Sequence, residues 1–377
     1  MRIAIIAGVA IALFLILGLV SSIMPITVTI NGTEHSLRAA KTLQTAAKES
    51  GLPLNPGDLI SLQGNVLKRN EGEQFSAVVN GEKVTDLDAR LHDGDKVNLS
   101  DGEDIVEPYE AVQQVIPRSA RIAGVGALHV VDSQGADGTL EIRTGSLSGE
   151  VVEKQTVAPE NATCNRYNAD SQGDKVIALT FDDGPSNKHT NEILDILAEN
   201  DAKATFFCVG TSIELDNNAD IVKRAYNEGH LICTHTYDHA RAGGSTNIGT
   251  LPAEGQVNEL VKGRQVITDT LGEEASRIVR LPGGSLDDDI LKNLYSYFDV
   301  EVGWNIDTAD WLQPGVDTIY EAMLMAGPGD IVLCHDGGGD RSQTIEALRK
   351  ALPELKRQGY QLVTVDKLLK YPARSNL

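Results

Sequence analysis

Cysteine is scarce in this sequence, and its four cysteines lack the C-x-x-C spacing that is typical of redox and zinc-binding motifs. Cys208, Cys233 and Cys334 stand in apolar runs, where a thiol behaves as a small hydrophobic side chain. We therefore expect no disulfide framework. A bridge between two of these three cysteines is the alternative, since neighbouring strands could bring two of them together.

Positive charge is also in deficit. The chain has 33 Lys and Arg against 54 Asp and Glu, which leaves a formal net charge of −21. Because a protein that binds a polyanion needs a basic surface, this balance argues against nucleic acid as the main partner. No G-x-G-x-x-G run is present, so a dinucleotide-binding fold is not indicated.

Charged residues are nearly absent from the start of the chain. Residues Ile3 to Met24 are apolar apart from Gly and the pair Ser21-Ser22, and Arg2 precedes them. A helix of this length spans a bilayer, and the positive charge before it places the remainder of the chain outside the cell. We predict a transmembrane anchor over residues 1–25, because the apolar region of a signal peptide has only roughly 7 to 15 residues. Cleavage at Val20-Ser21-Ser22, with secretion, is the alternative.

Two small modules are predicted to follow the anchor. Residues 26–105 contain short β-prone runs broken by Asn31-Gly32 and Asn80-Gly81, with one helical stretch from Leu43 to Lys48. Asn-Gly between such runs indicates a hairpin, and a hairpin, a helix and further strands resemble a β-grasp module. Residues 106–168 contain a second set of strand patterns and a linker. Neither segment has a cluster of ionisable residues, so we interpret both as spacers or adaptors.

The pattern changes in residues 169–377, where apolar runs of about six residues alternate with helical stretches. This alternation predicts parallel strands joined by crossover helices, in an α/β domain built as a deformed barrel of the (β/α)7 type. The predicted strands are 176–181, 204–209, 230–234, 278–281, 300–306, 331–335 and 361–365. The predicted helices include 192–197, 221–226, 257–271 and 344–358.

Polar residues of this domain gather where the predicted strands end, which in a parallel barrel is where the active site forms. Asp182 and Asp183 follow the first strand. Consecutive side chains of a strand point in different directions, so these two carboxylates can take different tasks. Further polar groups follow four other strands, at His235 to His239, Arg280 to Gly284, Asp307 to Trp311, and Leu333 to Asp336.

A metal site is predicted among these residues. His235 and His239 are four residues apart, so on one helical turn both imidazoles face the same way. A carboxylate from a neighbouring strand end completes a site with two histidines and one carboxylate. We expect zinc there, although cobalt, nickel or manganese fits the same ligands.

Five blocks together carry a family resemblance. In chain order they are Thr180-Phe181-Asp182-Asp183, His235-Thr236-Tyr237-Asp238-His239, Arg280-Leu281-Pro282-Gly283-Gly284, Asp307-Thr308-Ala309-Asp310-Trp311 and Leu333-Cys334-His335. With these blocks, residues from about Lys175 to Lys370 resemble the polysaccharide deacetylases of carbohydrate esterase family 4, which share the NodB homology domain.

The resemblance assigns metal ligands and a base. It implies that Asp183, His235 and His239 hold the metal, while Asp182 accepts a proton from the attacking water. Arg280 would lie beside Asp182 and keep its carboxylate ionised and correctly directed.

The resemblance also assigns the groups around the acetyl substituent. The backbone N–H of Gly283 would stabilise the oxyanion, although many relatives have an aromatic residue at this position. His335 would protonate the departing amine, and Asp310 would orient and charge its imidazole. Trp311 and Leu333 would form the walls around the methyl group, in addition to any packing role.

The expected function is metal-dependent removal of N-acetyl groups from an extracellular aminosugar polymer. Because a membrane-anchored enzyme meets the cell wall first, peptidoglycan N-acetylglucosamine is the favoured substrate. Chitin-like, β-1,6-glucosamine or acetylated xylan polymers are the alternatives, and a non-catalytic wall-binding protein is a third hypothesis. The expected partners are an acetylated wall glycan and, through the anchor, the cytoplasmic membrane.

Overall fold

The computed structural model describes residues 24–38, 40–52, 54–215, 217–240 and 247–374. The predicted anchor, residues 1–25, lies outside the described residues except for Met24 and Pro25, and it stays a prediction. Within the described ranges, no helix is long and apolar enough to cross a membrane. The chain divides into two compact units, one formed by residues up to Val115 with Thr139–Val157, the other by Ile116–Gly138 with Ala158–Leu377.

The first unit begins with a five-stranded sheet in the order β2-β1-β7-β5-β6. Its elements are β1 (Ile26–Ile30), β2 (Thr33–Leu37), α2 (Leu43–Glu49), β5 (Ser76–Val79), β6 (Glu82–Lys83) and β7 (Lys96–Ser100). Both predicted Asn-Gly turns are present, and Asn31 and Asn80 have the positive φ values of 47° and 53° that such hairpins require. Leu43 and Ala46 of α2 join Val28 and Val97 in the core. The resemblance to a β-grasp module stays a prediction.

Two three-stranded sheets complete this unit. They are formed by β3 (Leu59–Ile60), β4 (Val66–Lys68) and β8 (Ile105–Val106), and by β9 (Tyr109–Ile116), β12 (Gly138–Gly145) and β13 (Val151–Val157). Most side chains of β9 and β13 are exposed. One buried carboxylate stabilises the β12–β13 hairpin, because Glu107 accepts the backbone N–H groups of Leu147 and Ser148 at 2.7 and 2.9 Å.

The second unit is built on an eleven-stranded sheet in the order β10-β14-β11-β19-β18-β17-β16-β15-β21-β20, with β22 paired to β15. The strands are β10 (Ala120–Gly124), β11 (Leu128–Ser133), β14 (Ala162–Tyr167), β15 (Val176–Asp182), β16 (Thr205–Cys208), β17 (Leu231–Thr234), β18 (Ile278–Val279), β19 (Val300–Val302), β20 (Ile306–Asp307), β21 (Ile331–His335) and β22 (Gln361–Val363). The strands from β15 to β22 pair in parallel, which is the α/β arrangement that the alternating pattern predicts.

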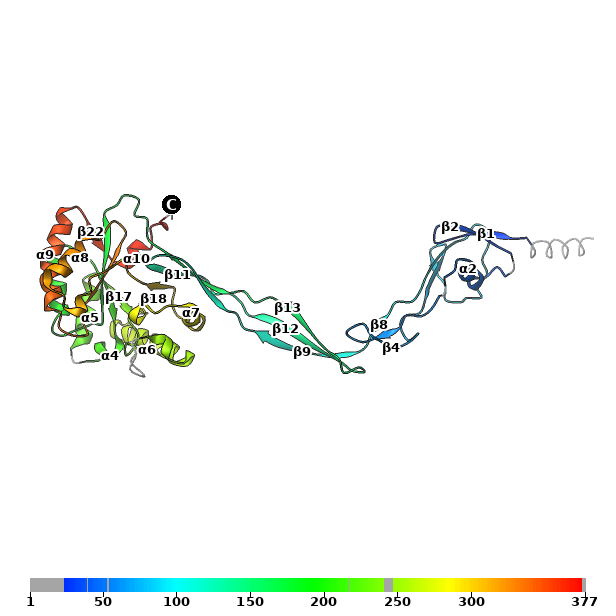
Figure 1. The fold of residues 1–377 in the computed structure, drawn as a ribbon, viewed down its shortest axis with the longest axis horizontal. Coiled ribbons are helices and arrows are strands. Elements are labelled where there is room, and N and C mark those ends of the chain that lie inside the picture. The colour runs from blue at the N-terminus through cyan, green and yellow to red at the C-terminus, as the bar shows by residue number, and fades with distance from the viewer. Residues whose placement is uncertain (1–23, 39, 53, 216, 241–246, 375–377) are drawn as a thin grey trace, which may run out of the picture. The chain divides into compact units, whose positions relative to one another are not determined.

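Helices cover the outer side of the curled sheet (Figure 1). The helices of this unit are α3 (Thr190–Glu199), α4 (Gly210–Ile213), α5 (Asn218–Asn227), α6 (Ala253–Leu271), α7 (Asp288–Leu294), α8 (Val316–Leu324), α9 (Ser342–Arg357) and α10 (Val365–Leu368), of which α10 packs on the opposite face of β15. The predicted helices over 192–197, 221–226, 257–271 and 344–358 correspond to α3, α5, α6 and α9, which begin two to four residues earlier than predicted and end within two residues of the predicted limits. Their apolar faces pack on the sheet around Phe181 and Phe206, whose rings stack at 5.1 Å.

The sheet is not a regular seven-stranded barrel, and two predicted strands account for the difference. Residues 300–306 form two strands, because β19 pairs with β18 and β11 while β20 pairs with β21. The carbonyl groups of Val302 and Gly303 accept hydrogen bonds from Arg280 instead of from a neighbouring strand. The last strand, β22, pairs only with Val176–Ala178 of β15. This unit is therefore an α/β fold with a curled, open sheet.

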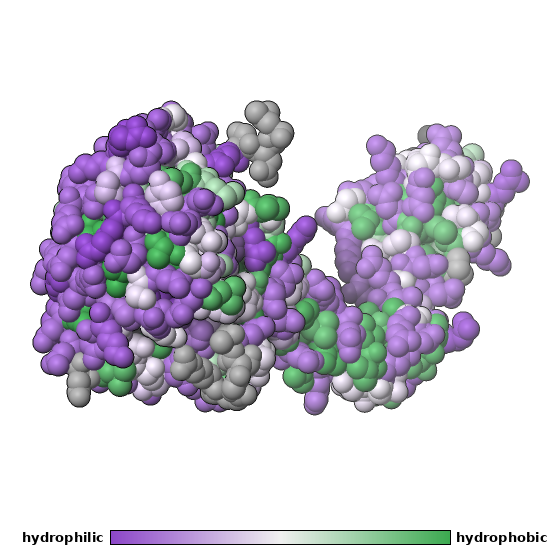
Figure 2. Space-filling view, turned by 60° about the vertical axis from the view of Figure 1, so that its left-hand side comes forward, coloured by the Kyte–Doolittle hydropathy of each residue, from purple (hydrophilic) through white to green (hydrophobic). Residues whose placement is uncertain are grey.

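The sheet also includes three strands, β10, β11 and β14, that precede residue 169. Antiparallel β11 pairs with β19 and β14, and a buried contact between His129 Nδ1 and Glu301 Oε2 joins β11 to β19. The compact units are thus divided differently from the predicted segments 106–168 and 169–377. The four cysteines are all buried and free. The visible surface is mainly hydrophilic (Figure 2), as expected for a chain with a net charge of −21.

Candidate active site

The two aspartates that follow the predicted first strand stand at the end of β15, a strand buried along its whole length. Asp182 is the last residue of β15 and only 3% exposed. Asp183 has a left-handed backbone with φ of 71°, so the chain turns directly after the strand. The two carboxylates consequently meet different partners, as the sequence predicts.

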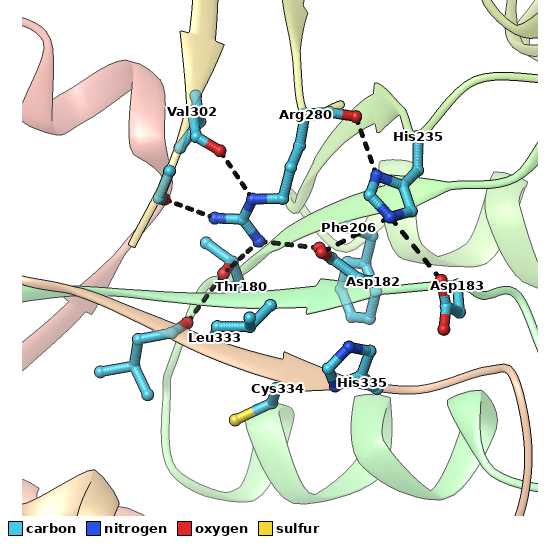
Figure 3. A network of polar contacts seen from close by, with 12 residues as sticks. Thr180, Asp182, Asp183, Phe206, His235, Arg280, Val302, Leu333, Cys334 and His335 are labelled. Atoms are coloured by element: carbon cyan, nitrogen blue, oxygen red, sulfur yellow. Dashed lines mark hydrogen bonds and ion pairs between the residues drawn. The ribbon is translucent and has the colours of Figure 1, made fainter. Parts of the chain in front are cut away.

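Arg280 supports the first of these carboxylates. Its guanidinium is fully buried, and Nη1 donates to Asp182 Oδ1 at 2.7 Å and to Thr180 Oγ1 at 2.8 Å. Nε and Nη2 donate to the carbonyl oxygens of Val302 and Gly303 at 2.8 and 2.9 Å. Figure 3 shows this fork pointing at Asp182. Since Nε, Nη1 and Nη2 of Arg280 all donate hydrogen bonds, Asp182 Oδ1 is held in place. Oδ2 is left to face His235, whose Nε2 lies 3.7 Å away.

His235 and His239 come from a loop after β17 and not from the helical turn that their spacing suggests. Thr236, His239 and Ala240 have left-handed φ values of 71°, 65° and 55°. A non-glycine residue in this region costs about 1–3 kcal/mol and persists only where surrounding contacts enforce it. The two imidazole rings nevertheless lie side by side, with their centroids 4.9 Å apart.

Asp183, His235 and His239 form a group whose ligand atoms all lie within 4.8 Å of one another. Asp183 Oδ1 is 3.6 Å from His235 Nε2 and 3.1 Å from His239 Nε2. Asp183 Oδ1 is buried, yet no hydrogen bond of normal geometry from the described residues reaches it. Two imidazoles and one carboxylate are ligands that suit zinc and related divalent ions. The residues present therefore fit a divalent metal ion.

The electrostatics of these three residues also suit metal binding. Burial lowers the pKa of His235, which keeps its imidazole neutral near pH 7. His235 Nδ1 donates to the Arg280 carbonyl oxygen at 2.8 Å, so the lone pair remains on Nε2 (Figure 3). For Asp183, burial opposes ionisation, but the imidazoles of His239, His235 and His335 lower its pKa well below the usual value. Asp183 is thus ionised near neutral pH, as a metal ligand needs to be.

His335 and Asp310 form a hydrogen-bonded pair of an imidazole and a carboxylate. His335 is the last residue of β21, and its Nδ1 lies 2.7 Å from Asp310 Oδ1. Asp310 is held in turn, because Oδ2 accepts the backbone N–H of His335 at 2.9 Å and the hydroxyl of Thr344 at 2.7 Å. Burial acts to lower the pKa of His335, but the hydrogen bond and charge of Asp310, with the charges of Asp182 and Asp183, raise it overall.

Asp182, the group Asp183, His235 and His239, and the imidazole of His335 all line one pocket of about 390 Å³. Its walls include Asp182, Asp183, His235, His239, Gly283, Trp311, Leu333 and His335, which are eight of the ten predicted site residues. The other two, Arg280 and Asp310, are buried behind the wall and contact Asp182 and His335. Gly283 has φ of 66°, which a glycine adopts readily and other residues avoid.

Four residues of the pocket wall received no predicted role, which are Trp304, Asp307, Gly338 and Arg341; of these, only Asp307 stands in a block that the sequence singled out. One signal was available for the first, since Trp304 and Trp311 are the two tryptophans of the whole chain and both line this pocket. Cys233 and Cys334 pack in the sheet as predicted, and burial raises the pKa of Cys233 to about 12, so its thiol is protonated and a poor ligand.

Comparison with known proteins identifies the family. The family model described as polysaccharide deacetylase matches residues 169–298. A Bacillus cereus protein named peptidoglycan-N-acetylglucosamine deacetylase is 41% identical over 201 residues, which cover 52% of this chain and 90% of that relative. The chain belongs to the polysaccharide deacetylase family. The resemblance to carbohydrate esterase family 4 is thereby confirmed.

Further similar proteins include a chitooligosaccharide deacetylase and a solved deacetylase structure. A chitooligosaccharide deacetylase of Rhizobium leguminosarum bv. trifolii is 35% identical over 201 residues, covering 50% of this chain and 89% of that protein. Among solved structures, a peptidoglycan N-acetylglucosamine deacetylase in complex with a hydroxamate-type benzamide is 32% identical, with a TM-score of 0.49 and coverage of 55% of this chain and 94% of the other.

Proposed function

We propose that this protein is a metal-dependent hydrolase that removes N-acetyl groups from an aminosugar polymer, with peptidoglycan N-acetylglucosamine as substrate. The observation that carries the proposal is the shared pocket. Three ligands suited to a divalent ion, the carboxylate of Asp182 and the imidazole of His335 all face the same space of about 390 Å³. A metal site, a base and an acid around one small pocket are what amide hydrolysis requires.

Asp182 serves as the base. A divalent ion held by Asp183, His235 and His239 would supply a Lewis acid that polarises a carbonyl and lowers the pKa of water. Asp182 Oδ2 lies 3.7 Å from His235 Nε2, so this oxygen faces the metal ligands while Oδ1 is bound by Arg280. The guanidinium fixes the direction of the carboxylate, and Oδ2 accepts the proton of the attacking water.

His335 serves as the acid. Its Nδ1–H donates to Asp310, which leaves Nε2 to carry a proton toward the pocket. Because the pKa of His335 is raised, the imidazole holds its proton to higher pH than an ordinary histidine does. Nε2 then gives its proton to the nitrogen of the departing amine, and the C–N bond breaks without releasing an unprotonated amide anion.

The acetyl group is bound by the remaining wall residues. Trp311 is 54% exposed and Leu333 only 4%, so one apolar side chain is free to meet the substrate and the other forms part of the buried floor. Both suit a methyl group. The N–H of Gly283, on the same wall, is the proposed donor to the oxyanion.

The location outside the membrane is part of the proposal. It is supported by the apolar run Ile3 to Met24 after Arg2 and by the first compact unit, which lacks the proposed catalytic residues. A single-pass anchor with an extracellular catalytic unit is favoured over secretion, because the apolar run is longer than that of a signal peptide. A mature amino terminus near residue 23 in membrane-free culture fluid would contradict the anchor.

Acetate release from three substrates tests the function. Purified wall sacculi, chitooligosaccharides and acetylated xylan should each be incubated with the zinc-loaded protein, with Asp182→Asn as the control for contaminating activity. We expect release from sacculi that Asp182→Asn lowers by about 10²- to 10⁴-fold. Absence of release from every amide substrate would reject the proposal. Elemental analysis of the isolated protein would identify the metal, for which zinc is the first choice and cobalt, nickel and manganese are alternatives.

Deacetylation of a chitin-like polymer is the second candidate. It is supported by relatives named chitooligosaccharide deacetylases at 33 to 35% identity. Faster release from chitooligosaccharides than from sacculi would favour it. A non-catalytic wall-binding role is disfavoured because every predicted ligand, base and acid is present in one pocket, and polar sites cost stability without a use.

A further inference from the structure

The loop that carries both histidine ligands is held by a carboxylate from a distant helix. Glu259 lies in α6, and its side chain is only 8% exposed. Glu259 Oε2 accepts the backbone N–H groups of Tyr237, Asp238 and Ala240 at 3.1, 3.0 and 3.4 Å. The carboxylate thus collects three donors from the short segment that runs from one histidine to the residue after the other.

A second residue on the same side of α6 allows this approach. Gly263 is one turn after Glu259, so the two positions share a face of the helix. A Cβ atom on Gly263 would lie 2.4 Å from Thr234 Oγ1 and 2.7 Å from the carbonyl carbon of Thr236. Only a residue without a side chain lets α6 pack this closely against the ligand loop.

The loop needs such support because its own geometry does not provide it. Three of its residues, Thr236, His239 and Ala240, have positive φ, and the segment forms no regular helix. Other contacts help at its start, where Thr236 N–H donates to Thr234 Oγ1 and the carbonyls of Thr236 and Tyr237 accept from α4. Near His239, by contrast, the N–H groups of Asp238 and Ala240 converge on Glu259.

We propose that Glu259 is a positioning residue of the metal centre. Its carboxylate stabilises the turn that brings His239 beside His235. Without an acceptor, three backbone N–H groups at the loop would lose their partner, and the turn would relax away from its left-handed conformation. His239 Nε2 would then leave its place 3.1 Å from Asp183 Oδ1. The inference rests on the proposed metal-dependent function and concerns the formation of its ligand set.

Metal affinity of the full chain tests this role without substrate. The Kd for Zn²⁺ should be measured by chelator competition on the metal-free protein, and Co²⁺ should report the ligand geometry through its visible absorption. We expect Glu259→Ala to raise the Kd by about 10- to 100-fold, as is usual when a group that orients a metal ligand is removed. Glu259→Gln keeps one acceptor oxygen without the charge, so it should fall between Glu259→Ala and the wild type.

The matched control is Glu254→Ala, which removes an exposed carboxylate from the same helix and should leave the Kd and the Co²⁺ spectrum unchanged. Gly263→Ala independently tests the close packing of α6 against the histidine loop and should also weaken Zn²⁺ binding. Circular dichroism and thermal melting of the metal-free variants establish which of them are folded. If Glu259→Ala fails to fold, Glu259→Gln and Gly263→Ala decide the question.

Folded Glu259 and Gly263 variants that bind Zn²⁺ as tightly as the wild type, with the same Co²⁺ spectrum, would overturn the positioning role. That result would leave the proposed deacetylase function intact. A wild type that binds the metal but releases no acetate would refute the function and not the role of Glu259. A wild type that binds neither ion would refute both.

Discussion

Arg280 and Asp182 form a buried ion pair, with Nη1 2.7 Å from Oδ1, between the ends of β18 and β15. These two strands are not neighbours, because β17 and β16 lie between them in the sheet. The pair therefore crosses the inside of the curled sheet, with the Arg280 guanidinium 4.2 Å from the centre of the Phe207 ring. One contact both fixes the direction of the base and ties two distant strands together.

Arg280→Ala should strongly lower the free energy of unfolding. Removing one partner leaves the carboxylate of Asp182 buried without its counter-charge, which typically costs about 3–5 kcal/mol. Urea denaturation of the metal-free protein measures the change. Arg277→Ala is the control, since it removes a partly exposed ion pair with Asp299 and should change stability by only a small part of that amount. Equal effects of the two substitutions would contradict the structural importance of the buried pair.

Asp182→Asn and Asp183→Asn should separate catalysis from metal binding. We expect Asp182→Asn to retain Zn²⁺ while acetate release falls by about 10²- to 10⁴-fold, because the base is lost. Asp183→Asn should lose metal and activity together, because this carboxylate is one of the three proposed ligands. Elemental analysis alongside the acetate assay distinguishes the two. Reversed outcomes would show that the roles of the pair are exchanged.

Asp310→Asn should move the alkaline side of the pH profile to lower pH. His335 must be protonated to act as the acid, so activity falls as the pH rises through its pKa. Burial lowers that pKa and Asp310 raises it, with a net upward shift. Without the carboxylate, the loss of activity should begin at lower pH. The test is the pH dependence of kcat/KM, with Asp317→Asn, an exposed acid paired with Lys350, as the control.

Trp311 and Leu333 should differ in what their removal affects. Trp311→Ala should lower kcat/KM about tenfold or more, since an apolar wall for the acetyl group is lost, and should leave stability nearly unchanged because the side chain is 54% exposed. Leu333→Ala should destabilise the fold by about 2–5 kcal/mol, as large-to-small changes in a core do. Thermal melts combined with kinetics would reveal the contrast. An equally destabilised Trp311→Ala would indicate a packing role.

Zinc removal should abolish activity and leave the fold in place. The sheet is stabilised by buried apolar side chains around Phe181 and Phe206, and the three proposed metal ligands lie at its edge. Dialysis against a chelator should stop acetate release, and added Zn²⁺ or Co²⁺ should restore it. Circular dichroism should change little between the two forms. Activity that survives complete removal of metal would contradict the proposed role of the ligand set.

Much of the catalytic unit was predictable because its signals are local. Apolar runs that alternate with helical periodicity indicate parallel strands, and β15, β16, β17 and β21 lie within about a residue of their predicted limits. The polar residues after those strands converge for a simple reason. Parallel strands place their carboxyl ends on one edge of a sheet, so Asp182, His235 and His335 meet in one pocket although they are far apart in the chain.

The errors came where a distant group overrides a local pattern. The spacing of His235 and His239 suggests a helical turn, but Glu259, about 20 residues later, stabilises a left-handed loop instead. The run 300–306 has the composition of one strand, yet Arg280 takes two of its carbonyl groups and divides it into β19 and β20. Neither contact can be recognised from the pattern of residues that are close together in the sequence.

The sequence by itself determines which chemical groups the site contains and in which order they follow along the chain. The residue types at the strand ends specify which ligands, base and acid are available. The direction of each group depends on tertiary contacts. Asp182 is turned by Arg280 and His335 by Asp310, while Glu259 shapes the histidine loop. Such contacts form only once packing excludes water, because a buried donor or acceptor must then find its partner within the protein.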